Sequence, residues 1–264
     1  MSADYVHGHH ASVMRSHTWR TAENSAGYLL PHLEPEMDVL DVGCGPGTIT
    51  VDLASRLPGG RVIGIDTSRD VLGKAADLAV ARGVENVQFE QADVTVLPYS
   101  PSSFDVVHAH QVLQHLSDPV AALREMRRVL RPGGLLAVRD ADYGGMRWFP
   151  ESEGLDRWLG LYQRLTSHHH SDAGRRLLSW ALEAGFADLT PSAGVWCFAE
   201  PDERDWWSTT WAERVLHSSF ASHATAGGYA TSEELAELAR AWHDWAAQDD
   251  AWFVVVHGEV LARR

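Results

Sequence analysis

Five short runs rich in β-branched residues constrain this chain most, because a helix-length stretch separates each from the next. The runs read MDVLDVG, RVIGID, VQFEQAD, FDVVHA and LLAVRD. Between them, TITVDLASRL, SRDVLGKAADLAVARG and DPVAALREMRRVLRPGG carry apolar residues at helical spacing. Strands that alternate with helices form βαβ units, in which the strands run parallel and helices cover both faces of the sheet. The sequence therefore predicts an α/β fold from about residue 38 to 140.

The second half of the chain predicts helical additions to the same sheet. GRRLLSWALEAGF indicates an amphipathic helix, LTPSAGVWCFA a strand, and AWFVVVHGEVLARR a last strand. Ten of the eleven tryptophans lie between Trp148 and Trp252, in a stretch that is otherwise mostly helical in pattern. We expect one domain with a seven-stranded sheet, to which helical pieces are added at 1–36, 146–173 and 201–250.

Composition excludes several classes of protein. With 45% apolar and 22% charged residues, a chain of 264 residues can bury a core of its own. The formal net charge of −14 disfavours nucleic acid as the main partner, because phosphate binding needs a basic surface. Two cysteines are too few for a disulfide framework, and no apolar run is long enough for a membrane span or a signal peptide. We therefore expect a cytoplasmic protein with no membrane partner.

The strongest chemical signal is a glycine-rich turn in VLDVGCGPGTIT. A buried strand is followed by Gly43, Gly45 and Gly47, and a helix is predicted from about Thr48. Glycines there permit positive φ and let a ligand approach the bare backbone at a helix N-terminus. The spacing is G-x-G-x-G, whereas the dinucleotide fingerprint is G-x-G-x-x-G, which disfavours an NAD-dependent oxidoreductase. Cys44, inside the turn, is expected to be a small packed residue and not a nucleophile.

Acidic residues end the first three predicted strands. Asp41 can order the glycine turn and receive an ammonium group through water, and Asp66 is placed to accept both hydroxyls of a ribose. Asp93 is well placed for the amine of an adenine. The alternatives are that Asp66 only caps the next helix and that Asp93 is an ordinary turn residue. Together the three carboxylates fit a ligand with adenosine at one end and an amino acid at the other.

In these motifs the chain resembles the class I S-adenosylmethionine-dependent methyltransferases, and is similar to the ubiquinone/menaquinone-biosynthesis type. The matching runs are VLDVGCGPG, GIDTS, QADVTVLPYSPSSFDVV, HAHQVLQHLSDP and VLRPGG, over about residues 37–140. The resemblance implies a Rossmann-like, mostly parallel sheet whose last strand is antiparallel. It also implies a single methyltransferase domain with five parts: an N-terminal helical lid (1–36), a cofactor-binding core (37–145), helical substrate-lid insertions (146–173 and 201–250), and remaining sheet and helix (174–200 and 251–264).

The same resemblance implies which residues bind S-adenosylmethionine. The glycine turn would line its methionine portion, and a basic residue of SHTWR would cover the methionine carboxylate. The residues assigned to the cofactor are Arg20, Asp41, Gly43, Cys44, Gly45, Asp66, Thr67, Val71, Asp93, Val94 and His110.

Residues beyond the cofactor turn are candidates for the methyl acceptor. A base is needed only where the acceptor must lose a proton, and His110 and Asp142 are the catalytic candidates. Expected substrate-binding residues are Tyr143, Trp148, Arg175, Trp207 and Trp211. The competing interpretations are core packing for the tryptophans and a solvated helix start for Arg175, while His108, inside the fourth predicted strand, is expected to be a core residue. No metal is predicted, because His168–His170 lack a cysteine or carboxylate partner at ligand spacing.

The sequence thus predicts a methyltransferase that moves a methyl group to an O, N or C atom of a small apolar or aromatic molecule. Two alternatives use the same fold and cofactor: a non-methylating reaction such as cyclisation, and a non-catalytic S-adenosylmethionine-binding module. The aromatic insertions are also compatible with a homodimer.

Overall fold

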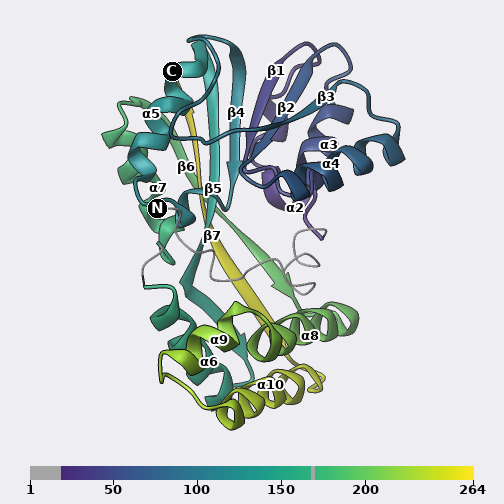
Figure 1. Ribbon diagram of the computed structural model, residues 1–264, viewed down its shortest axis with the longest axis vertical. Helices are drawn as coiled ribbons and strands as arrows, with labels where there is room; N and C mark the ends of the chain where they lie inside the picture. The colour runs from purple at the N-terminus through teal and green to yellow at the C-terminus, as the bar shows by residue number, and fades with distance from the viewer. Residues whose placement is uncertain (1–18, 168–169) are drawn as a thin grey trace. The chain divides into compact units, whose positions relative to one another are not determined.

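The computed structural model describes residues 19–167 and 170–264 (Figure 1). Its strands are β1 (Asp38–Val42), β2 (Arg61–Asp66), β3 (Val87–Gln91), β4 (Phe104–His110), β5 (Leu130–Phe149), β6 (Asp188–Phe198) and β7 (Trp252–Arg263). Its helices are α2 (Ala22–Ala26), α3 (Thr48–Ser55), α4 (Arg69–Arg82), α5 (Pro119–Val129), α6 (Glu153–Leu165), α7 (Ala173–Glu183), α8 (Pro201–His217), α9 (Ser219–Ala226) and α10 (Ser232–Ala246). Two 3-10 turns are η1 (Leu30–His32) and η2 (Leu113–His115).

The strands form one sheet in the order β3-β2-β1-β4-β5-β7-β6. β1 is parallel to both β2 and β4, β2 is parallel to β3, and β4 is parallel to β5, whereas β7 is antiparallel. The predicted Rossmann-like fold is confirmed, including the antiparallel last strand. The strand order reverses between β1 and β4, and ligands of open α/β sheets bind at the carboxyl ends of the strands beside such a reversal.

The chain divides into two compact units. Within the described residues, the sheet unit comprises 19–140, Ala173–Gly194 and His257–Arg264. The helical unit comprises 141–167, 170–172 and Val195–Val256, and so contains α6, α8, α9 and α10. The unit boundaries fall inside β5, β6 and β7, so each of these strands contributes residues to both units.

The sheet unit has an apolar core on each face of its strands. Side chains alternate along β1, so that Leu40 joins one core and Val39 the other. The first core includes Leu123 of α5 and Leu177 of α7, and the second includes Leu53 of α3. Helices therefore cover both faces, as predicted. Of the expected N-terminal lid, the structure describes 19–36, where the side chains of α2 are part of the second core.

The helical unit is built around buried aromatic rings. Trp158 of α6 lies edge-to-face with Trp211 of α8, at 4.5 Å between ring centroids, and with Trp242 of α10, at 4.7 Å. Phe253 of β7 packs against Trp242 at 5.4 Å. None of the described helices is long and apolar enough to span a membrane.

The fifth strand differs from its prediction. LLAVRD places its end at Asp140, whereas β5 continues to Phe149. A Cβ atom on Gly145 would lie 3.3 Å from Cβ of Val256, so a glycine suits the close approach of β7 there. The predicted start of a helical insertion at residue 146 is therefore wrong, because α6 begins at Glu153.

Candidate functional site

Strand register brings the candidate residues to one edge of the sheet unit. Val42 pairs with Ile65 on one side and with Ala109 on the other. The next residues, Gly43, Asp66 and His110, therefore lie at the same level on adjacent strands. Their positions mark the carboxyl edge beside the reversal in strand order, which is where a ligand of this fold is expected.

The glycine turn needs its glycines. Gly43, Gly45 and Gly47 all have positive φ, at 66°, 55° and 81°. A Cβ atom on Gly43 would lie 2.4 Å from Cγ2 of Val112. The turn is tied to the next strand by the Cys44 amide, which donates to the carbonyl of Ile65 at 2.9 Å. Since Gly43 is exposed, its bare backbone is open to a ligand.

Asp66 connects the glycine turn to the end of β2. Its Oδ2 accepts from the amide of Gly45 at 3.2 Å, and its Oδ1 accepts from the amide of Ser68 at 2.9 Å. The second bond closes a turn before α4, whose N-cap is Ser68, so Asp66 does not cap that helix as the alternative interpretation expects. The first bond holds the glycine turn. Each carboxylate oxygen has a further lone pair, and the residue is only half-buried, so Asp66 can also accept hydroxyl groups of a ligand.

Asp41 lies near the end of β1, just before the glycine turn. It is buried, its Oδ1 lies 2.7 Å from Nδ1 of His108, and its Oδ2 accepts from the hydroxyl of Thr50 at 2.5 Å. Both carboxylate oxygens are thus bonded to buried side chains. This arrangement supports the predicted role of ordering the turn; contact with an ammonium group stays a prediction.

The residues expected around the adenine lie near the ends of β2 and β3. Val71 and Val94 are buried, whereas Thr67 and Asp93 are exposed. Oδ1 of Asp93 accepts from both the amide and the hydroxyl of Thr95, at 2.8 and 2.7 Å. Asp93 therefore forms a turn, as the alternative interpretation expects, and its carboxylate remains accessible to solvent.

Buried polar side chains lie at the carboxyl end of β4 and directly after it. His110 is buried, and its burial, with Arg20 and Arg139 as lesser causes, holds its pKa well below the usual range. A neutral imidazole of low basicity is a weak general base, although it can donate or accept a hydrogen bond. Nη2 of Arg20 donates to Oε1 of Gln111 at 2.8 Å, and Nε2 of Gln111 lies 2.9 Å from Nε2 of His257.

Sequence reasoning missed Gln111 and His257. His257 lies in the last strand, 146 residues after Gln111, and no local pattern connects the two. The only local signal is that Gln111 directly follows a strand at the ligand edge, as His110 ends it.

Two further side chains at this edge have raised pKa values. Burial, followed by the charges of Asp41 and Asp66, raises the pKa of the Cys44 thiol, so the thiol stays protonated and is not a nucleophile. Burial raises the pKa of Asp140 to about 8, and its Oδ2 has no hydrogen-bond partner among the described residues.

The structure places most of the predicted acceptor residues in the helical unit. Asp142 is buried, and Tyr143 packs against Tyr162 at 4.8 Å. The three tryptophans that were expected to bind substrate contact other aromatic rings. Trp148 stacks on Phe253, Trp207 stacks on Phe198 at 4.2 Å, and Trp211 lies edge-to-face with Trp158. The core interpretation accounts for the burial of Trp207 and Trp211, and their contact with substrate stays a prediction. Arg175 is exposed on α7 in the sheet unit.

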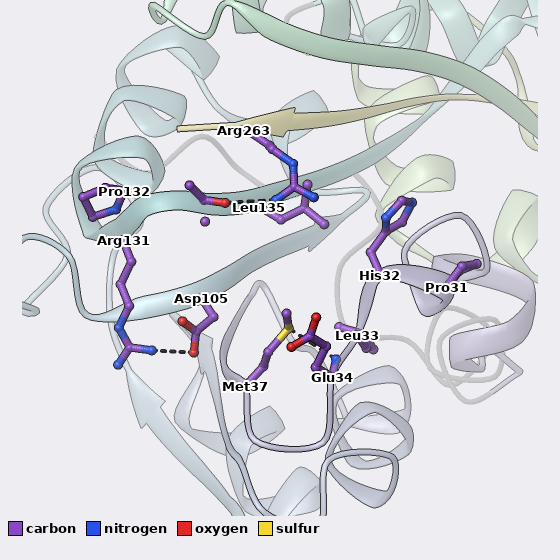
Figure 2. Close-up of a pocket in the computed structure, with 12 residues that line it drawn as sticks. Pro31, His32, Leu33, Glu34, Met37, Asp105, Arg131, Pro132, Leu135 and Arg263 are labelled. Atoms are coloured by element: carbon purple, nitrogen blue, oxygen red, sulfur yellow. Dashed lines mark hydrogen bonds and ion pairs between the residues drawn. The ribbon is translucent and has the colours of Figure 1, made fainter.

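A separate cavity of about 430 Å³ lies at the amino ends of the parallel strands, away from the carboxyl edge (Figure 2). Met37 precedes β1, and Asp105 and Arg131 are the second residues of β4 and β5; all three line the cavity. Arg131 is bonded to Asp105 and donates to Asp38 at 2.9 Å. None of the predicted site residues lines this cavity. Among the described residues, no cluster of His, Cys, Asp and Glu could hold a metal, while His168 and His169 lie outside them.

Comparison with known proteins identifies the family. A family described as "Methyltransferase domain" matches residues 33–185. An uncharacterised methyltransferase of Schizosaccharomyces pombe is 34% identical over 270 residues, covering 98% of this chain and 96% of its own. A probable methyltransferase, LtbC, of Aspergillus luteorubrus is 33% identical over 277 residues with the same coverage. The ubiquinone/menaquinone biosynthesis C-methyltransferase of Bdellovibrio bacteriovorus is 41% identical over only 38% of this chain. The similarity to the ubiquinone/menaquinone-biosynthesis type therefore covers only part of the chain.

Among solved structures, the [4+2]-cyclase SpnF is similar over 96% of this chain and 81% of its own. The TM-score is 0.53 and the sequence identity 27%.

The residues at the carboxyl edge fit S-adenosylmethionine. A Cβ atom is excluded at Gly43, where the backbone is exposed, Asp66 offers acceptors to a ribose, and Arg20 offers a cation to a carboxylate. These groups match the hydroxyls and the amino-acid end of that cofactor, and nothing in the G-x-G-x-G turn requires a pyrophosphate. When bound, the cofactor supplies an activated methyl group. The chain belongs to the methyltransferase-domain family and is an S-adenosylmethionine-dependent methyltransferase.

Proposed function

We propose that this enzyme transfers the methyl group to an O, N or C atom of a small apolar or aromatic molecule. The observation that carries the acceptor class is the aromatic helical unit. Three of its buried indole N–H groups, those of Trp158, Trp207 and Trp242, have no hydrogen-bond partner among the described residues. Small-molecule sites are lined mostly by apolar and aromatic side chains with a few polar groups, so a unit rich in aromatic residues favours an apolar or aromatic acceptor.

The net charge supports a small molecule as the partner. A formal net charge of −14 disfavours RNA or DNA as the methyl acceptor, because polyanions are bound by basic surfaces. Methyl transfer from a sulfonium is an in-line displacement, so the enzyme contributes mainly proximity and alignment.

A second candidate function is a non-methylating reaction such as cyclisation. Its support is the similarity to SpnF, which is described as a [4+2]-cyclase and which matches nearly the whole chain. Under this proposal the cofactor would be bound but not consumed.

One experiment separates the two. The full chain is incubated with S-adenosylmethionine and a panel of phenols, enols, aromatic amines and polyene lactones, and products are identified by mass spectrometry. Methyl transfer predicts S-adenosylhomocysteine in equal amount to an acceptor heavier by one CH₂. Cyclisation predicts a product of unchanged mass and no S-adenosylhomocysteine. Binding of the cofactor without any turnover over the whole panel would contradict both and favour a binding module.

A further inference from the structure

A glutamine in a strained conformation stands directly after β4. Gln111 has φ of +54°, in the left-handed region that non-glycine residues rarely adopt. Its amide donates to the carbonyl of Arg139 at 2.7 Å, which fixes the backbone against β5. Glycine would adopt this conformation without strain, so the side chain of Gln111 requires its own explanation.

Both ends of that side chain are hydrogen-bonded to distant parts of the sheet unit. Oε1 accepts from the guanidinium of Arg20 at 2.8 Å, and Nε2 lies 2.9 Å from Nε2 of His257. A guanidinium only donates, so the oxygen of the amide must face Arg20 and its nitrogen must face His257. His257 then accepts through Nε2 and carries its proton on Nδ1.

The neutrality of Gln111 matters for Arg20. An amide holds the guanidinium in place and leaves its positive charge intact, whereas a carboxylate at the same position would neutralise it. Gln111 and His257 are buried and His257 stacks on His110 at 6.0 Å between ring centroids, so the groups that bond to Arg20 are themselves held by buried contacts.

We propose that Gln111 is a positioning residue, which holds Arg20 as the cation for the carboxylate at the amino-acid end of S-adenosylmethionine. This inference rests on the proposed use of that cofactor. Gln111 would then affect binding only through Arg20, and only for ligands that carry the carboxylate.

The test compares two ligands. S-adenosylhomocysteine carries the amino-acid end, and 5′-methylthioadenosine lacks it. Calorimetric titrations use the wild type, Arg20→Ala, Gln111→Ala, Gln111→Glu and the double variant Arg20→Ala/Gln111→Ala. We expect each single variant to weaken S-adenosylhomocysteine binding by about ten- to a hundred-fold and to leave 5′-methylthioadenosine binding unchanged. The double variant should be no weaker than Arg20→Ala, because the two residues act as one unit.

Gln163→Glu is the control for the added charge, because Gln163 is exposed on α6, and it should bind both ligands as the wild type does. If the Gln111 variants weaken both ligands equally and lower the melting temperature in parallel, the role is structural and the proposal is overturned. Additive losses in the double variant would also overturn it. Failure of the wild type to bind either ligand would instead reject the cofactor site itself.

Discussion

At the scale of single residues, the carboxyl edge of the sheet unit is a layer of buried polar groups with specific partners. Asp41 is bonded to His108 and Thr50, and the buried pair Arg139–Glu259 is joined at 3.0 Å. Buried polar groups of this kind are costly when a partner is lost, so each one fixes its neighbours. The ligand-facing groups are therefore preorganised before a cofactor arrives.

Asp66 provides the most direct test among these residues. Asp66→Ala removes acceptors for ribose hydroxyls and the bond to the Gly45 amide, and should weaken S-adenosylhomocysteine binding by about 1.5–3 kcal/mol, or ten- to a hundred-fold. Asp70→Ala, which removes the same charge from an exposed position of α4, should change the affinity little. Equal affinities of the Asp66 variant and the wild type in calorimetry would show that the carboxylate does not meet the ligand.

Asp140 makes the stability of the protein depend on pH. Its pKa is about 8 in the folded chain because of burial, whereas an unfolded aspartate titrates near about 4. Between these values the folded state binds more protons, so the free energy of unfolding falls as pH rises.

Asp140→Asn should remove this dependence, which amounts to about 1.4 kcal/mol per pH unit between about pH 5 and 7. Urea unfolding at several pH values measures it, with the wild type losing stability relative to the variant as pH rises. Parallel pH profiles for both proteins would mean that Asp140 is ionised in the folded state.

At the scale of elements, the glycine turn and the helix that follows depend on backbone geometry. Gly43→Ala should abolish cofactor binding and destabilise the fold, because φ is positive and the new methyl group would collide with Val112. Gly73→Ala is the matched control: Gly73 lies in α4 with open space around it, so the change should raise the free energy of unfolding by about 0.5–1 kcal/mol. A stable, ligand-binding Gly43→Ala protein would contradict the geometry of the turn.

Trp207 of α8 distinguishes core packing from substrate contact. Trp207→Ala removes a buried ring stacked on Phe198 and should cost about 3–5 kcal/mol of stability. Trp207→Phe keeps an aromatic ring but loses the indole N–H. We expect this second variant to remain folded, to bind S-adenosylhomocysteine normally and to lose acceptor turnover. Unchanged turnover in Trp207→Phe would assign the ring to the core alone.

The elements also show what the sequence could predict. Strands β1 to β4 follow the runs of β-branched residues, and the glycine turn is marked by its spacing, so both predictions are confirmed. The stretch between β3 and β4 forms no helix, so the predicted alternation of strands and helices is wrong at that point. The run LLAVRD does not indicate the extension of β5 beyond Asp140, where the strand packs at Gly145 against Val256 of β7, more than a hundred residues later in the chain. Gln111 was missed because its partners, Arg20 and His257, are 91 and 146 residues away.

At the scale of the whole molecule, one chain carries two compact units of different composition. The sheet unit holds the predicted cofactor residues, and the helical unit holds most of the predicted acceptor residues and most of the tryptophans. A variant in the helical unit should therefore leave cofactor affinity measurable. Cofactor affinity and acceptor turnover can thus be measured separately.

The carboxyl edge of the sheet unit is expected to bind S-adenosylmethionine. Calorimetric titration of the full chain with S-adenosylmethionine, S-adenosylhomocysteine and NAD tests this expectation most directly. We expect saturable one-to-one binding of the two sulfur compounds, weakened in Asp66→Ala, and no binding of NAD, since the turn lacks the third fingerprint glycine. Binding of NAD alone, or of none of the three, would contradict it.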